Sequence, residues 1–265
     1  MKLAKILEKA RKLGILPSYF VFHPTYLLYV ILQHLRDLDS FFTNPVNRTL
    51  GKSQKKPKCN KISIIIPVYN GPVKWLKQAI DSVLVQNTNN WELIIVDDNS
   101  NHNETLEFLK GLSNPKIKVK FLSKNQGISS ALNNGIQIAT GDYITFLDQD
   151  DFLEKDALMA INDAIQKFNP DIIYTDENFY HQGLINSFFY SPHFKPDYSP
   201  DLLLTHNYIT HLMVLKKEIL DSCGFFRTEY DGAQDYDLIL RASEIADTIC
   251  HIRKVLYHWR IHTGS

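Results

Sequence analysis

Carboxylate side chains gather at two places where an apolar run of the sequence ends. Asp148, Asp150 and Asp151 follow "DYITF", and Asp97 and Asp98 follow "WELIIV". Carboxylates held close together repel one another, so they need a bound proton or a cation. Hard divalent cations such as Mn²⁺ or Mg²⁺ take oxygen ligands and often complete their shell with phosphate oxygens. The residue types and their spacing therefore indicate a metal site that also receives a phosphate-bearing ligand.

A simpler interpretation of the group formed by Asp148, Asp150 and Asp151 is an acidic loop at the start of a helix. A helical pattern follows from Glu154 to Phe168, and both Asp151 and Glu154 are suited to cap it. The tripeptide Asp148-Gln149-Asp150 does not by itself decide between the two interpretations. The arrangement of the surrounding elements must decide it.

An alternation of strand and helix patterns positions these acids. Apolar, β-branched strand patterns occupy residues 62–70, 91–98, 117–122, 142–148 and 171–177. Helical patterns occupy the intervals between them. This order predicts an α/β fold with a mainly parallel sheet and helices on both faces. Ligands bind beyond the carboxyl ends of the strands in such sheets, and that is where both acidic groups fall.

The order of the motifs resembles one enzyme family. No GxxxxGKS/T loop and no GxGxxG follows the first strand, which disfavours an NTPase or a dehydrogenase. Instead the strands end in "PVYN", "VDDNS" and, after "NQGISSALNNGIQIATGDYITF", in "LDQDD". Taken together, residues 61–262 resemble the family 2 glycosyltransferases, which have the GT-A (Rossmann-like) fold.

The resemblance implies a set of positions for the nucleotide. Pro67 and Tyr69 would line the base, and Asp98 would accept a hydrogen bond from the uracil imide with Asp97 beside it. Lys124, just before "NQG", is a further candidate for phosphate. The alternatives are that Tyr69 is an ordinary aromatic residue at a strand end and that Asp98 is a turn or cap residue.

The resemblance also implies that Asp148 and Asp150 face the ribose and a metal that bridges the diphosphate. The segment "VLYHWRIH" adds His258, Arg260 and His262, which alternate along a predicted strand. His262 is the first choice and His258 the second for completing the metal shell, and Arg260 is the candidate to neutralise the leaving phosphate. The alternative is a strand with solvated ends.

The segment "EYDGAQDYDLIL" supplies the candidate base. Asp231 and Gln234 are spaced as a capping box, which places Asp235 in the first turn of a helix. An acid is favourable there for electrostatic reasons alone. The resemblance instead implies that Asp235 deprotonates the acceptor hydroxyl, with Asp237 as a second candidate. Because the helix dipole favours the ionised form, Asp235 is expected to be charged at neutral pH and only a modest base.

The function implied by the resemblance is metal-dependent transfer of a sugar with inversion. The donor would be a sugar on UDP, with dTDP as second choice, and the acceptor a hydroxyl of a glycan or of a lipid-linked acceptor. A looser resemblance of "FKPDYSPDLLLTHNYITHL" to enzymes of bacterial surface polysaccharides, some containing rhamnose, suggests a cytoplasmic protein at the membrane surface. The rival interpretations are a nucleotidyltransferase-like enzyme and a non-catalytic glycan-binding module.

The sequence divides into four predicted parts. Residues 1–50 form a basic, helical N-terminal extension that either packs on the main domain or lies on a membrane surface. Residues 51–61 are a linker, 62–177 the nucleotide-sugar-binding half and 178–265 the acceptor-binding half. The early end after "HWRIHTGS" suggests a catalytic module of a longer protein or a very short enzyme.

Composition narrows the classes of protein. Lys and Arg total 29, as do Asp and Glu, so no excess of positive charge favours nucleic acid as a partner. The three cysteines are too few and too widely spaced for a disulfide framework, which suggests a reducing compartment. No apolar run is long enough to predict a transmembrane helix.

Overall fold

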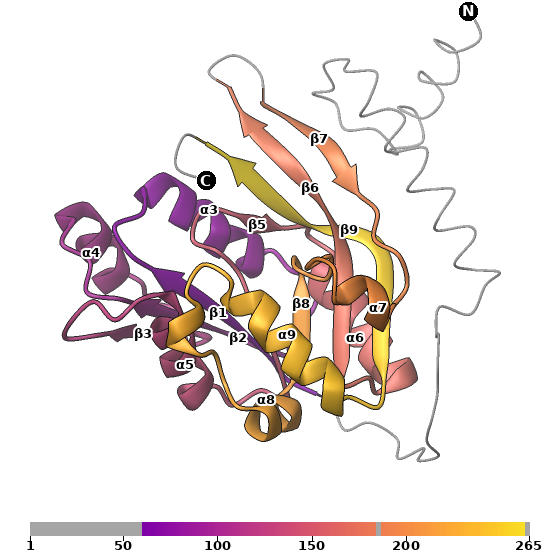
Figure 1. Cartoon of the computed structure of the whole chain (residues 1–265). Coiled ribbons are helices and arrows are strands. Elements are labelled where there is room, and N and C mark those ends of the chain that lie inside the picture. The colour runs from indigo at the N-terminus through magenta and orange to yellow at the C-terminus, as the bar shows by residue number, and fades with distance from the viewer. Residues whose placement is uncertain (1–59, 184–186, 263–265) are drawn as a thin grey trace, which may run out of the picture.

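The structure is a computed structural model that describes residues 60–183 and 187–262 (Figure 1). The predicted N-terminal extension and nearly all of the predicted linker lie outside the described residues, so the structure does not test them. Within the described ranges, no helix has both the length and the apolar character needed to cross a membrane.

The first half of the sheet is parallel. Its strands are β1 (Ile62–Val68), β2 (Trp91–Asp97), β3 (Ile117–Phe121) and β4 (Tyr143–Phe146). They lie in the order β3-β2-β1-β4, and each neighbouring pair is parallel. Every residue of β2 is buried. Burial on both faces explains why these strands read as continuous runs of Ile, Leu and Val rather than as alternating patterns.

The second half of the sheet is mixed. It contains β5 (Phe152–Leu153), β6 (Ile172–Gln182), β7 (Ser187–His193), β8 (Met213–Lys216) and β9 (Ile249–Ile261). β8 lies between β4 and β6 and is antiparallel to both, whereas β6 and β9 are parallel. The predicted α/β sheet is confirmed, but its antiparallel members were not anticipated. They arise because β6 does not pair with β4. The later strand β8 lies between the two and runs in the opposite direction to both.

Helices cover both faces of the sheet, as predicted. They are α3 (Val73–Leu84), α4 (Asn103–Lys110), α5 (Ile128–Ile138), α6 (Ala157–Phe168), α7 (Pro200–Leu203), α8 (Lys217–Cys223), the 3₁₀ turn η1 (Thr228–Tyr230) and α9 (Gln234–Ile245). Residues of α3, α4 and α6 share one buried cluster, and residues of α5, α8 and α9 share the other.

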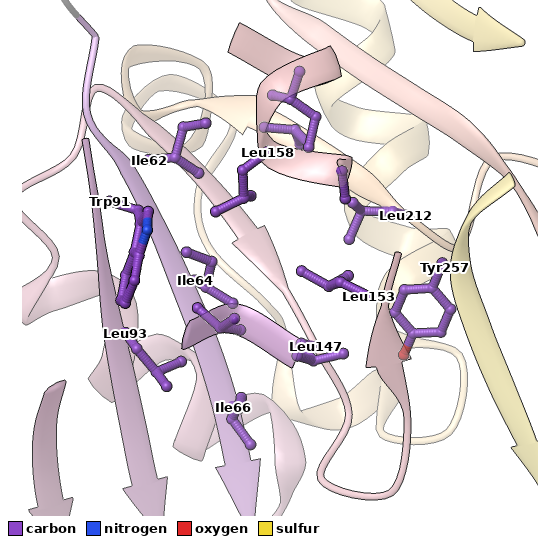
Figure 2. Close-up of a cluster of buried hydrophobic side chains, with 14 of the residues drawn as sticks. Ile62, Ile64, Ile66, Trp91, Leu93, Leu147, Leu153, Leu158, Leu212 and Tyr257 are labelled. Atoms are coloured by element: carbon purple, nitrogen blue, oxygen red, sulfur yellow. The ribbon is translucent and has the colours of Figure 1, made fainter. Parts of the chain in front are cut away.

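The alternation of side chains along β1 joins the two buried clusters. Ile64 and Ile66 belong to the cluster with α3 and α6, shown in Figure 2, whereas Ile65 belongs to the cluster with α5 and α9. Each fully buried isoleucine contributes about 1.5–3 kcal/mol relative to an exposed one. The strand is therefore held from both faces, and its carboxyl end, where the candidate site begins, is fixed in place.

β6 crosses the predicted boundary between the two halves at residues 177 and 178. It pairs with β9 from Ile172 to His181 and with β7 from Glu177 to Gln182. The two halves therefore share one sheet. In Figure 1, the outer parts of β6, β7 and β9 lie together, and we call them the β6–β7–β9 ribbon.

Candidate active site

Two loops at the carboxyl ends of the strands are fastened together by Gln149, the middle residue of the Asp-Gln-Asp motif. Its side-chain oxygen accepts from the Tyr69 backbone N–H at 3.2 Å, and its amide nitrogen donates to the Tyr69 carbonyl at 3.3 Å. A Cβ added at Gly71 would lie only 2.3 Å from the Gln149 Oε1. The structure thus brings the predicted nucleotide residues Pro67, half-buried in β1, and Tyr69, whose side chain is exposed, next to the acidic loop.

The two aspartates at the end of β2 are buried and differ in their partners. Asp98 accepts hydrogen bonds from the backbone N–H groups of Gln126 and Gly127, both at 2.9 Å. It therefore holds the start of α5 in place, and a uracil imide would have to share these oxygens, which have further lone pairs. Asp97 accepts from the Ser100 N–H at 3.1 Å through one oxygen. Its other oxygen, Oδ1, is buried with no hydrogen-bond partner among the described residues.

Asp148 and Asp150 each face a histidine from the second half of the chain. Asp150 Oδ2 lies 2.7 Å from His262 Nε2, just beyond the end of β9. Asp148 Oδ2 lies 3.5 Å from Nε2 of His211, which precedes β8. Both carboxylates remain partly exposed, so the structure offers two acids and two imidazoles at one edge of the sheet.

Asp151 does not belong to this partly exposed group. It is buried, and it accepts from the Tyr257 hydroxyl at 2.6 Å and from the Arg260 N–H at 2.7 Å. Burial, with the charges of Asp148 and Asp150, raises its pKa well above the usual range. The alternative that Asp151 or Glu154 caps the following helix is wrong, because α6 begins at Ala157 after Asp156. Asp151 instead joins the acidic loop to β9.

The prediction that Arg260 contacts the leaving phosphate does not agree with its position. Its side chain is fully buried, and it donates to the Asp150 carbonyl, to Gln182 and to Gln78 at 2.6–2.7 Å. It also lies against three aromatic rings, those of Trp75, Phe152 and Tyr180. Arg260 therefore positions the backbone of Asp150 and is not presented to a ligand.

The two candidate metal histidines occupy different surroundings. His262 packs on the Trp75 ring at a centroid distance of 4.5 Å and faces Asp150. His258 is buried, and its Nδ1 lies 2.6 Å from the Asn178 side-chain oxygen and its Nε2 3.4 Å from Glu154. Of the two, the structure places His262 at the acidic loop.

His211 is a member of the site that the sequence did not reveal. Its ring stacks on Tyr257 at 4.8 Å, and its backbone N–H donates to Glu177 Oε2 at 2.6 Å. Burial opposes the charged form, but the carboxylates of Asp148 and Glu177, each 3.5 Å from a ring nitrogen, outweigh it and raise the pKa of His211 to about 10. The ring is therefore a cation at neutral pH. No motif or spacing in "THNYITHL" marks this histidine apart from its position ahead of a strand.

The His211 backbone is held by a second buried cation, Lys195. The Lys195 ammonium donates to the backbone carbonyls of Ile209 and His211 and lies 3.7 Å from Glu177 Oε2. Burial raises the pKa of Glu177, but its hydrogen bonds to His193 and His211 and the Lys195 charge hold that pKa at about 2. Glu177 is therefore a carboxylate that orients His211.

Asp235, the candidate base, lies in the first turn of α9 and is half-buried. Burial raises its pKa to about 6, the Asp148 charge adds to the increase, and the His211 cation opposes it. Because this value lies below neutral pH, Asp235 is still mostly charged there, as predicted, but burial outweighs the helix dipole and makes it a stronger base than expected. The mutual influence of Asp235, Asp148 and His211 also means that the base and the acidic loop share one site.

The neighbours of Asp235 differ from their predicted roles. Asp231 does not cap α9; it accepts from the Ser129 N–H at 3.3 Å, at the start of α5. Asp237, the second candidate base, forms ion pairs with Arg227 and Arg241, which hold its pKa below the usual range. That pairing makes Asp237 an anchor of the helix.

Lys124 is exposed, and in the described part of the chain it makes no hydrogen bond or ion pair. No contact among residues 60–183 and 187–262 joins it to the acidic loop. Its predicted contact with phosphate is therefore left without support from the geometry.

The acidic loop offers few donor groups for the predicted cation. No three or more His, Cys, Asp or Glu side chains of the described residues are arranged around a common point as a metal site. Asp150 and His262 form an oxygen and nitrogen pair, with Asp148 nearby on its own histidine. Mg²⁺ and similar ions are often held by one or two carboxylates and the phosphates of a substrate. The residues therefore fit a cation that is shared with a phosphate ligand.

A family model described as "Glycosyl transferase family 2" matches residues 63–224, which is more than half of the chain. The chain belongs to glycosyl transferase family 2. The motifs at the carboxyl ends of β1, β2 and β4 all lie inside the matched region of this family 2 chain. Asp235 and His262 lie beyond it.

Relatives of this family 2 chain include two curated bacterial proteins. The O-antigen biosynthesis protein RfbC of Myxococcus xanthus is 34% identical over 75% of this chain and 16% of RfbC. The chondroitin synthase of Escherichia coli is 32% identical over 76% of this chain and 29% of the synthase. The chain thus spans less than a third of the length of either relative.

Among solved structures, S. aureus TarS residues 1–349 in complex with UDP-GlcNAc is similar, with a TM-score of 0.65 and 22% identity. The match covers 77% of this family 2 chain and 60% of the TarS chain. This likeness shows the fold, and it confirms the predicted GT-A arrangement.

Proposed function

We propose that this family 2 chain catalyses transfer of a sugar from a UDP-sugar to a hydroxyl of a glycan or of a lipid-linked acceptor, with inversion. The observation that carries the proposal is the position of Asp235. A half-buried carboxylate with a pKa of about 6 lies within electrostatic reach of Asp148 and His211. A base with a pKa just below neutral pH is mostly deprotonated and still a useful proton acceptor.

The donor is proposed to lie across the carboxyl ends of β1, β2 and β4. The uracil base of the donor would lie near Pro67 and Tyr69. In this region Oδ1 of Asp97 is buried and has no hydrogen-bond partner among the described residues, which supports a hydrogen-bond donor of the ligand there. The diphosphate would lie by Asp150 and His262. These two side chains would hold Mn²⁺ or Mg²⁺, which when bound would neutralise the charge of the diphosphate.

The chain's own residues perform the remaining steps of the proposed reaction. Asp235 accepts the proton of the acceptor hydroxyl while that oxygen forms a bond to the anomeric carbon. The bond from this carbon to the diphosphate oxygen breaks on the opposite side, so the configuration inverts. The His211 cation, 3.5 Å from Asp148, keeps positive charge at the site as the diphosphate departs.

The choice of substrates rests on the relatives. TarS was solved with UDP and with UDP-GlcNAc, which supports UDP over dTDP and makes UDP-GlcNAc the first donor to test. RfbC is named for O-antigen biosynthesis and the E. coli relative for chondroitin synthesis, which supports a growing polysaccharide as acceptor. We place the reaction at the cytoplasmic face of a membrane, where lipid-linked acceptors are available.

Calorimetry with UDP, with and without MnCl₂, tests the proposal. Wild-type protein should bind UDP more tightly with Mn²⁺, and Asp150→Ala should lose that dependence because the Asp150 and His262 pair is broken. Asp163→Ala, which removes an exposed acid on α6, is the matched control. If UDP affinity changed neither with Mn²⁺ nor in Asp150→Ala, the proposed metal role would be rejected. Binding of CTP or GTP in place of UDP would favour nucleotidyl transfer, and absence of all nucleotide binding a glycan-binding module.

A further inference from the structure

One face of the β6–β7–β9 ribbon carries a row of three aromatic side chains. The strand register pairs Phe179 of β6 with Tyr190 of β7 on one side and with Trp259 of β9 on the other. The ring centroid of Phe179 lies 5.6 Å from that of Tyr190 and 5.7 Å from that of Trp259. We call Tyr190, Phe179 and Trp259 the aromatic row.

The aromatic row begins at the candidate active site. The previous row, separated from it by a register shift between Glu177 and Phe179 on the β7 side, pairs Glu177 with His193 and with Tyr257, and His211 lies over it. The His211 ring is also 5.3 Å from the Trp259 ring, edge to face. His211 therefore contacts both Asp148 of the acidic loop and Trp259 of the aromatic row.

The aromatic row is only half-buried, and the next row outward contains Phe188, which is 37% exposed. The opposite face of the ribbon shows the contrast, because there Tyr180 and His258 pack closely on the Phe152 ring of β5. That face contributes to the packing of the sheet. The aromatic row leaves apolar ring surface in contact with water, which is a common mark of a binding surface.

The polar atoms of the row are also available. Within the described residues, neither the Tyr190 hydroxyl nor the Trp259 ring N–H makes a hydrogen bond. His181 and His193 flank the row and are exposed. A pyranose ring offers an apolar C–H face that packs on aromatic rings and hydroxyl groups that bond to such donors and acceptors.

We propose that the aromatic row is the subsite for the sugar units of the acceptor that lie next to the unit being glycosylated. This inference rests on the proposed function, because it places the reacting hydroxyl at Asp235 and leads the rest of the glycan along β6, β7 and β9. Continuity with the active site favours a glycan over a lipid surface. So does the mixture of aromatic residues with the exposed His181 and His193 in place of the aliphatic residues of a lipid-facing surface.

The test uses the full chain with UDP and MnCl₂, labelled and applied to an array of immobilised bacterial surface oligosaccharides. Wild-type protein should bind one or more glycans. Tyr190→Ser and Trp259→Leu should each weaken that binding about tenfold, since aromatic anchors dominate such contacts. Trp259→Phe should recover most of it because a ring is retained. Met159→Ala, at an exposed apolar residue of α6, should bind as wild type does.

UDP calorimetry and thermal melting of the same variants separate the possible causes. Weaker glycan binding with retained UDP affinity and melting temperature supports the subsite. Unchanged glycan binding by both Tyr190→Ser and Trp259→Leu would overturn it, as would wild-type protein that binds UDP but no glycan. Loss of binding to phosphatidylglycerol vesicles with retained glycan binding would also overturn it, in favour of a membrane contact. If wild-type protein bound no UDP, the proposed function itself would fail.

Discussion

At the scale of single residues, the properties of the site are set by burial acting against charge. Asp235 and His211 carry opposite charges near Asp148, and each is displaced from its ordinary pKa. The pKa of Asp235 rises to about 6 mainly through burial, whereas that of His211 rises to about 10 because two carboxylates outweigh burial. Asp235 is thus a base that can accept a proton, and His211 is a cation that retains its own proton at neutral pH.

Replacing the base should separate catalysis from donor binding. Asp235→Asn keeps the shape of the side chain but cannot accept a proton, so we expect kcat to fall by about 10²–10⁴-fold. UDP affinity, measured by calorimetry, should change less than about twofold because Asp235 is not proposed to contact the nucleotide. Glu244→Gln, on the exposed face of the same helix, is the control. A large loss of UDP affinity in Asp235→Asn would remove Asp235 as the base.

The pH profile should report the same group. Because the deprotonated form of Asp235 is the active one, kcat/KM should be low in acid and rise through a midpoint of about 6. His211→Asn removes the cation that opposes the increase, so the midpoint should move to higher pH. A midpoint near the ordinary aspartate value of about 3.9, or one that His211→Asn leaves in place, would contradict this assignment.

At the scale of elements, loops and strand ends are held by buried polar side chains that link distant segments. Gln149 links the acidic loop to the end of β1, and Asp151 links it to β9. Glu92 does the same at the opposite end of the parallel strands. It accepts from Ser63 at 2.7 Å and from the Thr140 N–H at 2.7 Å, between α5 and β4. Each of these hydrogen-bonded links fixes a strand or loop that positions residues of the site.

Glu92→Gln should therefore destabilise the fold without touching the site. Glu92 is buried, with Lys61 at 3.0 Å and Lys118 at 2.8 Å. We expect a loss of about 2 kcal/mol in the free energy of unfolding at pH 7, a modest value because both lysines are partly exposed. Urea denaturation measures it, with Glu107→Gln on the exposed side of α4 as the control.

The same substitution should alter how stability depends on pH. Burial raises the pKa of Glu92, but hydrogen bonds from Lys118, Thr140 and Ser63 outweigh it and hold that pKa far below the usual range. A depressed pKa gives stability that is present above the unfolded value of about 4.3 and is lost as pH falls below it. The difference between wild type and Glu92→Gln should therefore shrink in acid. A constant difference from pH 7 to pH 3 would contradict the linkage.

At the scale of the whole molecule, the mixed sheet brings the second half of the chain to the acidic loop. β8 enters between β4 and β6, which places His211 beside Asp148, and β9 returns beside β6 to place His262 beside Asp150. The site therefore exists only when both halves are folded into one sheet. Residues 1–50 lie outside the described residues. Their role at the membrane surface stays a prediction.

Deletion of residues 1–50 tests that role. The segment is basic and has helical apolar spacing, so it is expected to bind anionic lipid. Co-sedimentation with phosphatidylglycerol vesicles should retain the full chain and release the shortened one, and the difference should diminish at high salt because the charges are screened. Equal sedimentation of both forms would reject the membrane role of this segment.

The sequence by itself determined the features that depend on neighbouring residues along the chain. The strand and helix patterns, the helices on both faces and the position of the acids at strand ends follow from local periodicity and from the rule that parallel strands share a carboxyl edge. The ordered motifs were enough to predict the family and its fold. Asp148, Asp150 and His262 were named from the sequence, and the structure places them at one edge.

Only the tertiary structure decided what each polar side chain near that edge is free to do. Arg260 and Asp151 look like ligand-binding residues in the sequence, but both are buried and bonded within the protein. His211 has no motif and becomes part of the site because β8 is inserted beside β4. The pKa of Asp235 follows its burial and not its place in a helix. Burial and pairing depend on segments that are distant in the sequence, so no local pattern specifies them.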